Sequence, residues 1–168
     1  MCAADCCCSG GFELHLIGHL QRNKARAASA LFACVQSIDK AETAEALDAR
    51  CEERGRTMDI LLELNTSGEP TKSGFLSRGA LLAGLETIGK LPHLRVRGLM
   101  TVGPLSDDTR EIRSSFGALR SAFEEIRAGG GLPFFDTLSM GMSSDFEIAV
   151  DEGATLVRVG TALFGRRE

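Results

Sequence analysis

The sequence predicts an α/β protein built on a parallel sheet, either doubly wound or closed as a (β/α) barrel. Three observations lead to this fold class: short apolar runs recur along the chain, helical patterns lie between them, and no linker marks a second domain. The 168 residues, 43% hydrophobic and 25% charged, suit one globular domain with its own core. The order of strands and helices alone does not choose between the two architectures.

Six apolar runs are the expected strands. They are short and rich in Leu and β-branched residues, which is typical of parallel strands that are buried on both faces. They lie at residues 13–18, 32–38, 59–65, 94–102, 134–140 and 155–160.

Helical patterns separate these strands. In the clearest one, at residues 109–127, apolar residues recur at spacings of four and three and form one stripe. Asp108 and Glu111 stand at its start with the spacing of a capping box, and a run of three glycines follows it. Further helices are expected at residues 22–31, 40–54, 77–90 and 144–152, the last with Ser144 and Glu147 as a second capping box.

Charge and hydropathy exclude several classes of partner. The net charge of −4 and the pI near 5.5 argue against a protein that binds the phosphate backbone of nucleic acids. No apolar run approaches the roughly 18 residues of a membrane-spanning helix, and the N-terminus lacks the features of a signal peptide. We expect a cytoplasmic protein with neither nucleic acid nor membrane as a partner.

The six cysteines do not form the pattern of a disulfide-stabilised domain. Four of them crowd the first eight residues: Cys2, Cys6, Cys7 and Cys8. No His or second Cys pair stands at metal-ligand spacing from them, so a metal-binding or acylated tail has little support. We expect residues 1–12 to be a disordered leader, no metal site, and Cys34 and Cys51 to be small core residues.

Two turns near the C-terminus are candidates for an anion site. Residues 138–150, LSMGMSSDFEIAV, lead from a strand through a Ser- and Gly-rich turn into a helix, whose free N–H groups face that turn. The next strand ends in a second Gly-rich segment, residues 158–165, and barrel enzymes often bind phosphate at such adjacent strand ends. The alternative is that the glycines only permit tight turns. Arg158 lies in an apolar strand and needs a partner, for which a ligand is one option.

Four segments carry a resemblance to a known family. They are HLIGHLQRNK (15–24), LLELNTSGEPTKSGF (61–75), VRGLMTVGP (96–104) and LSMGMSSDFEIAVDEGATLVRVGTALFGRR (138–167). In this order they resemble the pyridoxal phosphate homeostasis proteins, which are built like the N-terminal barrel of alanine racemase. The resemblance extends from about residue 13 to the end of the chain.

The resemblance implies a (β/α)8 barrel of the TIM type that binds pyridoxal 5′-phosphate (PLP). Members have no established catalytic reaction and act in intracellular vitamin B6 and amino-acid homeostasis, so no catalytic residue is expected. By the same likeness the phosphate is surrounded by Ser139, Gly141, Ser143, Gly160 and Thr161. Arg158 then faces the pyridine nitrogen, where a cation disfavours protonation of the ring. Plausible wall residues of the cofactor site are His19, Asn65 and Met100.

The sequence also departs from the family. Members begin with a strand that bears the Schiff-base lysine and continue to a second strand with a Gly-Glu-Asn-Tyr-like motif, and neither block is found here. The six predicted strands would be strands three to eight, with residues 13–168 forming an incomplete barrel; a truncated or shifted start is our hypothesis. The lysines are Lys24, Lys40, Lys72 and Lys90, of which Lys24 and Lys72 follow strand ends. None matches the family lysine, so a covalent link to PLP is not predicted.

An open six-stranded sheet leaves two strand edges unpaired. Members of the family are monomers, but here we expect self-association through these edges. Three functions stay open: a PLP-binding homeostasis protein, a racemase-like PLP enzyme, and a non-functional remnant or interaction fragment. The racemase is disfavoured because it needs a tyrosine as second acid or base, and the chain has none.

Overall fold

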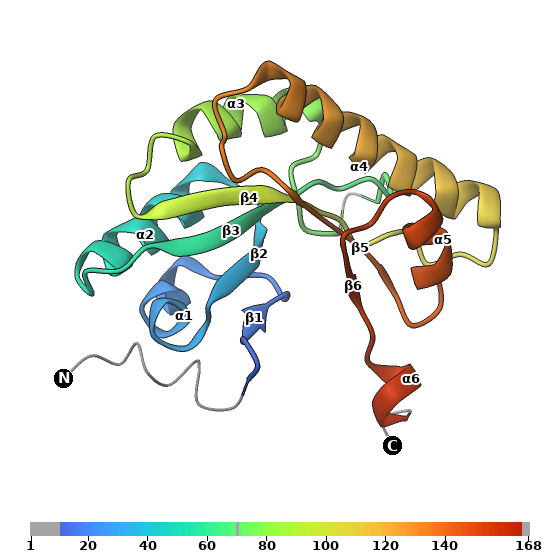
Figure 1. Ribbon diagram of the computed structural model, residues 1–168, viewed down its shortest axis with the longest axis horizontal. Helices are drawn as coiled ribbons and strands as arrows, with labels where there is room; N and C mark the ends of the chain where they lie inside the picture. The colour runs from blue at the N-terminus through green and yellow to red at the C-terminus, as the bar shows by residue number, and fades with distance from the viewer. Residues whose placement is uncertain (1–10, 70, 166–168) are drawn as a thin grey trace.

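The protein is a curled parallel sheet with helices on its convex side (Figure 1). The computed structural model describes residues 11–69 and 71–165. Within them six strands pair in chain order, each parallel to the next. The strands are β1 (His15–Leu16), β2 (Cys34–Ile38), β3 (Met58–Glu63), β4 (Leu94–Met100), β5 (Thr137–Met142) and β6 (Leu156–Arg158).

A helix follows each strand, as the predicted alternation requires. The helices are η2 (Arg22–Lys24), α1 (Ala25–Leu31), α2 (Ala41–Glu52), α3 (Arg78–Ile88), α4 (Thr109–Gly129), α5 (Phe146–Asp151) and α6 (Thr161–Phe164). The order of the strands in space equals their order in the sequence, which is the arrangement of a (β/α) barrel and differs from a doubly wound sheet. The structure thus decides between the two predicted architectures in favour of a partial barrel.

The core lies between the sheet and the helices. Ile38, Ile60 and Leu99 of the strands pack in one buried cluster with Leu47 of α2 and Phe116 of α4. A smaller cluster on the opposite face of the sheet joins Cys34, Leu61 and Met100. Because both faces of the central strands are buried, their sequences are apolar without alternation.

The amphipathic helix α4 forms where its apolar stripe predicts it. The stripe is buried along its whole length: Ile112, Phe116, Leu119, Phe123 and Ile126. Asp108 caps the helix, since its carboxylate accepts the N–H of Arg110 at 2.8 Å. The N–H of Asp108 donates to the Ser106 hydroxyl at 3.1 Å. The helix ends at glycines in left-handed conformations, as expected.

The second predicted capping box is wrong. Helix α5 begins at Phe146, and its N-cap position is held by Asp145, with no side-chain cap bond. The Asp145 carboxylate instead accepts the N–H of Met142 at 2.6 Å, which closes the turn before the helix and leaves Ser144 outside it. The short helix α6 was not predicted, because its Gly-rich sequence was interpreted as the end of a strand.

The cysteine prediction is confirmed for the described residues. Cys34 and Cys51 are free and buried, and burial raises the pKa of both thiols, that of Cys34 to about 12. The predicted leader, including its four cysteines, lies outside the described residues except for Gly11 and Phe12.

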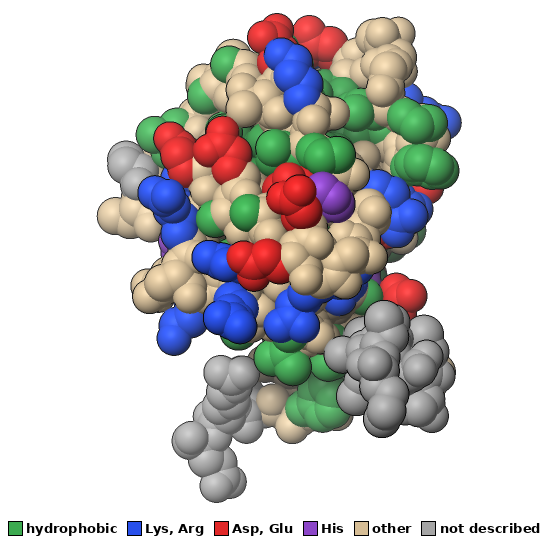
Figure 2. Space-filling model, turned by 90° about the vertical axis from the view of Figure 1, so that its left-hand side faces the viewer, with side chains coloured by type: hydrophobic (Ala, Val, Ile, Leu, Met, Phe, Trp, Pro, Cys, Tyr) green, Lys and Arg blue, Asp and Glu red, His purple; other side chains and the backbone are tan. Residues whose placement is uncertain are grey.

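Neither a metal site nor a spanning helix is found in the part of the chain that the structure describes. Within residues 11–69 and 71–165, His, Cys, Asp and Glu form no cluster of three or more suited to a metal ion. In the same ranges no helix combines the length and the apolar character needed to cross a bilayer. On the face shown in Figure 2, acidic and basic side chains are intermixed, so their charges partly offset one another.

The two outer strands are open edges. Among the described strands, β1 pairs only with β2, and β6 only with β5, so the sheet does not close on itself. Apolar side chains accompany the β1 edge: Phe12, Leu14 and Ile17 are 64%, 46% and 50% exposed. Unpaired backbone beside exposed apolar groups is a template for pairing with another strand.

We therefore expect the chain of 168 residues to self-associate. Size-exclusion chromatography with light scattering should show an apparent mass that rises with protein concentration. Replacing Ile17 by Lys should shift the chain toward the monomer, because a charged edge resists strand pairing. The control Leu76→Lys, at a side chain that is 71% exposed between β3 and α3, should leave the association unchanged. A wild-type chain that stays monomeric at all concentrations would contradict the expectation.

Candidate functional site

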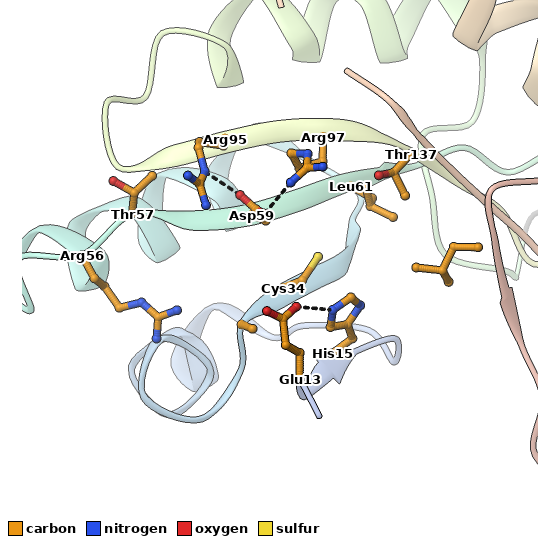
Figure 3. A pocket seen from close by; sticks show the side chains of 12 residues that line it. Glu13, His15, Cys34, Arg56, Thr57, Asp59, Leu61, Arg95, Arg97 and Thr137 are labelled. Carbon is orange, nitrogen blue, oxygen red and sulfur yellow. Dashed lines mark hydrogen bonds and ion pairs between the residues drawn. The ribbon is translucent and has the colours of Figure 1, made fainter. Parts of the chain in front are cut away.

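The concave face of the sheet has two ends with different chemistry. One end gathers residues at the starts of the strands, and the other gathers the loops that follow them. Figure 3 shows the first, a cavity of about 330 Å³ lined by Glu13, His15, Cys34, Arg56, Asp59, Arg95 and Arg97 among others.

The charges at this amino end satisfy one another. Asp59 accepts from Arg95 Nε at 2.6 Å and from Arg97 Nη1 at 3.0 Å, and both contacts are drawn in Figure 3. Arg97 also donates to Asp136 through Nε and Nη2, which raises the pKa of Arg97 and lowers that of Asp136. Arg56 donates to the backbone carbonyls of Ser29 and Phe32. These arginines are engaged in structural contacts, so they offer little to an anionic ligand.

The carboxyl end is the better candidate for a binding site. A cavity of about 310 Å³ lies there, lined by Ile17, His19, Glu63, Thr71, Lys72, Ser73 and Val102. In (β/α) barrels, ligands bind at the ends of the strands where the chain turns toward the helices. Polar side chains from the end of β3 and from the loops after β1 and β3 meet at this cavity, with Val102 after β4 as an apolar wall.

Arg158, the last residue of β6, is the central cation of this end. Its Nη1 donates to the Ser139 hydroxyl and its Nη2 to the Thr101 carbonyl, both at 2.7 Å. Burial lowers the pKa of Arg158, while Asp145 and Glu63 oppose the shift, and a guanidinium keeps its charge under such conditions. These bonds use two of its five N–H groups, and the other three have no hydrogen-bond partner among the described residues.

Ser139 on β5 is the partner of Arg158. It is fully buried, and its hydroxyl donates to Oε1 of Gln36 on β2 at 2.7 Å. The Gln36 amide nitrogen in turn lies 2.8 Å from Nδ1 of His15 on β1. A chain of polar side chains therefore crosses the concave face from β1 to β6.

The two turns predicted to bind an anion lie together. The Ser143 hydroxyl, in the turn after β5, accepts the N–H of Gly160 at 3.1 Å and that of Ala162 at 3.4 Å. Gly160 and Thr161 are exposed, and a Cβ on Gly160 would meet nothing within 4 Å. The hydroxyls of Ser143 and Thr161 thus lie at one open turn, whose Gly160 and Ala162 N–H groups are already bonded to Ser143. Hydroxyl donors beside open space suit a phosphate group.

Gly141 has another reason to be glycine. Its φ is +90°, and a Cβ there would lie 2.5 Å from Cβ of Ala149 and 3.0 Å from Cα of Phe146. The absence of a side chain allows α5 to pack directly on β5. Gly141 is buried beneath the turn, and its own geometry is explained by this packing.

The three predicted wall residues occupy different places. His19 lines the carboxyl-end cavity, with its Nδ1 3.1 Å from Asp39 Oδ2. Asn65 organises the loop after β3, donating to the carbonyls of Glu69 and Lys72 and accepting from Ser67. Met100 is fully buried in the small cluster on the concave face.

The two lysines that were expected on this side also differ. Lys24 ends the short helix η2 and is exposed. Lys72 reaches the carboxyl-end cavity, but its ammonium donates to the Gly103 carbonyl at 3.1 Å and pairs with Glu69 at 2.7 Å.

Sequence reasoning missed three residues of this end: Gln36, Glu63 and Thr101. Gln36 and Glu63 are polar residues within largely apolar strands, a signal similar to the one that singled out Arg158. Glu63 is 5% exposed, and burial together with the charge of Asp39 raises its pKa to about 7, against the opposing effect of Arg158. Asp39 Oδ1 is buried without a hydrogen-bond partner among the described residues.

Comparison with known proteins shows what the chain resembles. Residues 10–168 match the family model described as alanine racemase, N-terminal domain. The pyridoxal phosphate homeostasis protein of Aquifex aeolicus is 38% identical over 158 residues, which cover 93% of this chain and 68% of the relative. The chain therefore belongs to the family of the pyridoxal phosphate homeostasis proteins.

Solved structures of relatives agree with the fold. PipY of Synechococcus elongatus, in a structure with PLP bound, is 37% identical, has a TM-score of 0.85, and is matched over 94% of this chain and 72% of its own. Alanine racemase of Clostridium difficile, at 12% identity and a TM-score of 0.77, shares the fold over 95% of this chain. The predicted partial TIM-type barrel is confirmed, and the chain spans about two thirds of the length of the curated relatives that it matches.

Gly141→Ala should destabilise the protein, because the new Cβ meets α5 and the backbone is held at positive φ. We expect a loss of about 2 to 4 kcal/mol in the free energy of unfolding, measured by urea titration. The control Gly117→Ala, within α4 and with no contact closer than 3.9 Å, should stabilise by up to about 1 kcal/mol. A Gly141→Ala variant of unchanged stability would contradict the packing role.

Glu63→Gln should stabilise the protein at pH 8 and not at pH 4. The folded-state pKa of Glu63 is raised from 4.5 to about 7, so the folded protein retains a proton that the unfolded chain releases. The wild type therefore loses stability as pH rises through this window, by about 3 kcal/mol at about 1.4 kcal/mol per pKa unit. Urea titrations at both pH values measure the difference. The control Glu45→Gln, on the exposed side of α2, should show none, and an equal effect of Glu63→Gln at both pH values would contradict the assignment.

Proposed function

We propose that this protein binds PLP at the carboxyl end of its sheet and serves PLP homeostasis without catalysing a reaction. The observation that carries the proposal is the Arg158 guanidinium, anchored by two hydrogen bonds at the strand ends, close in the chain to an open turn that bears the Ser143 hydroxyl. Membership of the family, the names of the relatives and the PLP-bound structure of PipY support the same ligand.

The phosphate group would lie at the turns formed by Ser143, Gly160 and Thr161. The hydroxyls of Ser143 and Thr161 would donate hydrogen bonds to it, and the missing side chain of Gly160, whose N–H already bonds Ser143, would leave room for the phosphate oxygens. Ser139 and Gly141 would hold the surrounding structure in place and would not contact the phosphate: Ser139 is bonded to Arg158, and Gly141 packs against α5.

Arg158 would donate to the pyridine nitrogen of the bound ring. A guanidinium has donors only and keeps its proton, so the ring nitrogen must act as the acceptor and stays unprotonated. PLP supplies an electron sink to enzymes, and this sink is weak when its ring nitrogen carries no proton. The arrangement therefore suits retention of the cofactor better than carbanion chemistry.

The walls of the site would come from β1, β3 and β4. His19 lies at the rim of the carboxyl-end cavity and Met100 beneath it, while Asn65 holds the loop that bounds it. Lys72 is bonded to Gly103 and Glu69, so we propose that PLP is held here mainly through its phosphate and ring nitrogen rather than by a lysine.

Titration with PLP, followed by its visible absorption and by equilibrium dialysis, tests the proposal. We expect saturable binding of one PLP per chain, without a covalent adduct after borohydride reduction and mass spectrometry. Ser143→Ala and Arg158→Leu should each weaken binding about tenfold or more, since each removes a charge-assisted hydrogen bond.

Two outcomes would change this picture. Absence of PLP binding to the wild type would overturn the proposed function. A borohydride-trapped adduct would overturn the noncovalent mode and would identify the lysine by peptide mapping. The control Arg56→Leu, at the amino end of the concave face, should leave PLP binding unchanged.

A further inference from the structure

We infer that Gln36 is a positioning residue of the ligand site: through Ser139 it aligns the Arg158 guanidinium and so makes the site selective for ligands with a ring-nitrogen acceptor. This inference rests on the proposed function and adds to it the residues that set its selectivity. Gln36 lies on β2, on the far side of the concave face from the strand that carries Arg158.

The contacts form one continuous chain over four strands. His15 Nδ1 lies 2.8 Å from Gln36 Nε2, Ser139 Oγ donates to Gln36 Oε1 at 2.7 Å, and Arg158 Nη1 donates to Ser139 Oγ at 2.7 Å. Gln36 and Ser139 are 103 residues apart in the sequence, so only the curled sheet brings them together.

The direction of each hydrogen bond follows from the chemistry of the groups. A hydroxyl has a single proton, and the Ser139 proton goes to Gln36 Oε1, which turns the oxygen lone pairs toward Arg158. His15 Nδ1 takes an N–H of the same amide, so the amide oxygen faces Ser139. Without Gln36, the hydroxyl loses its acceptor and no longer presents a fixed lone pair to the guanidinium.

A second anchor fixes the plane of the guanidinium. The Thr101 carbonyl accepts from Nη2 at 2.7 Å, and Thr101 is fully buried directly after β4. Bonds to Nη1 and Nη2 from different strands leave a planar group little freedom to rotate. The remaining N–H groups of Arg158 are thereby given fixed directions before a ligand arrives, which lowers the entropic cost of binding.

Because Gln36 is buried, we expect it to affect a ligand only through the residues that it contacts. Gln36 and Ser139 are 1% and 0% exposed, so neither side chain is open to solvent. A buried amide or hydroxyl is costly unless it is hydrogen-bonded, and an apolar side chain would fill the same place without that requirement. Orientation of the Arg158 guanidinium explains why polar residues occupy these buried positions.

A pair of ligands that differ only at the ring nitrogen tests this selectivity. We compare PLP with its analogue in which that nitrogen is replaced by CH. The wild type should bind PLP about tenfold or more tightly, as expected for one hydrogen bond from a charged donor. Gln36→Leu should reduce this preference severalfold while leaving the affinity for the analogue unchanged. Gln36→Glu, which keeps an acceptor for Ser139, should retain the preference.

A matched control separates alignment from general loss of structure. Ser37→Ala, at the neighbouring residue of β2, removes a buried hydrogen bond to the Gly18 carbonyl and should not alter the ratio of the two affinities. An unchanged ratio in Gln36→Leu, or an equal loss for both ligands, would overturn the inference.

A measurement without ligand keeps the inference distinct from the proposed function. In ¹⁵N-labelled protein, slow rotation of the anchored Arg158 side chain should give resolved Nη–H signals, assigned by their loss in Arg158→Leu. In Gln36→Leu these signals should average, and in Ser37→Ala they should persist. Failure of the wild type to bind PLP would overturn the proposed function, whereas unaltered Arg158 signals in Gln36→Leu would overturn the positioning role.

Discussion

The anchoring of one half-buried guanidinium constrains the whole concave face. Arg158 stands in a strand that is otherwise apolar, where a charge without partners would be costly. Two acceptors bind the guanidinium, each at 2.7 Å: the Ser139 hydroxyl on β5 and the Thr101 carbonyl after β4. The strands must curl until β5 faces β2, because Ser139 of β5 is itself bonded to Gln36 of β2. Curvature, polar interior and candidate site are therefore parts of one arrangement.

Arginine side chains at the two ends of the concave face have different hydrogen-bond partners. At the amino end, Asp59 and Asp136 neutralise Arg95 and Arg97, so the guanidinium groups are structural. At the carboxyl end, Arg158 meets mainly neutral acceptors and keeps donors free, while Glu63 nearby is held with a raised pKa by burial. An anionic ligand with an acceptor nitrogen would supply what the carboxyl end lacks.

Much of the fold could be predicted from the sequence, because apolar runs and the α4 stripe are local signals that packing reinforces. The closure of the turn before α5 could not, since Asp145 rather than Ser144 holds the position before the helix. Among the candidate residues, Ser143 and Gly160 lie in hydrogen-bond contact, while Arg158 is bonded to Ser139 and to the Thr101 carbonyl. Gln36 was missed because its partner Ser139 is 103 residues away, and Gly141 is explained by contact with Ala149, which no turn signature reveals.

The stability of the candidate site depends on the two outer strands of the sheet, because β1 and β6 carry the two ends of its hydrogen-bond chain. Strands β1 and β6 each have one neighbour among the described strands, yet the polar chain from His15 to Arg158 links these two edges across the concave face. A crystal structure of the protein grown with PLP would show where the cofactor binds. We expect the phosphate at the turns of Ser143, Gly160 and Thr161, with the ring nitrogen facing Arg158. Density for PLP at the amino end, beside Arg95 and Arg97, would contradict this expectation.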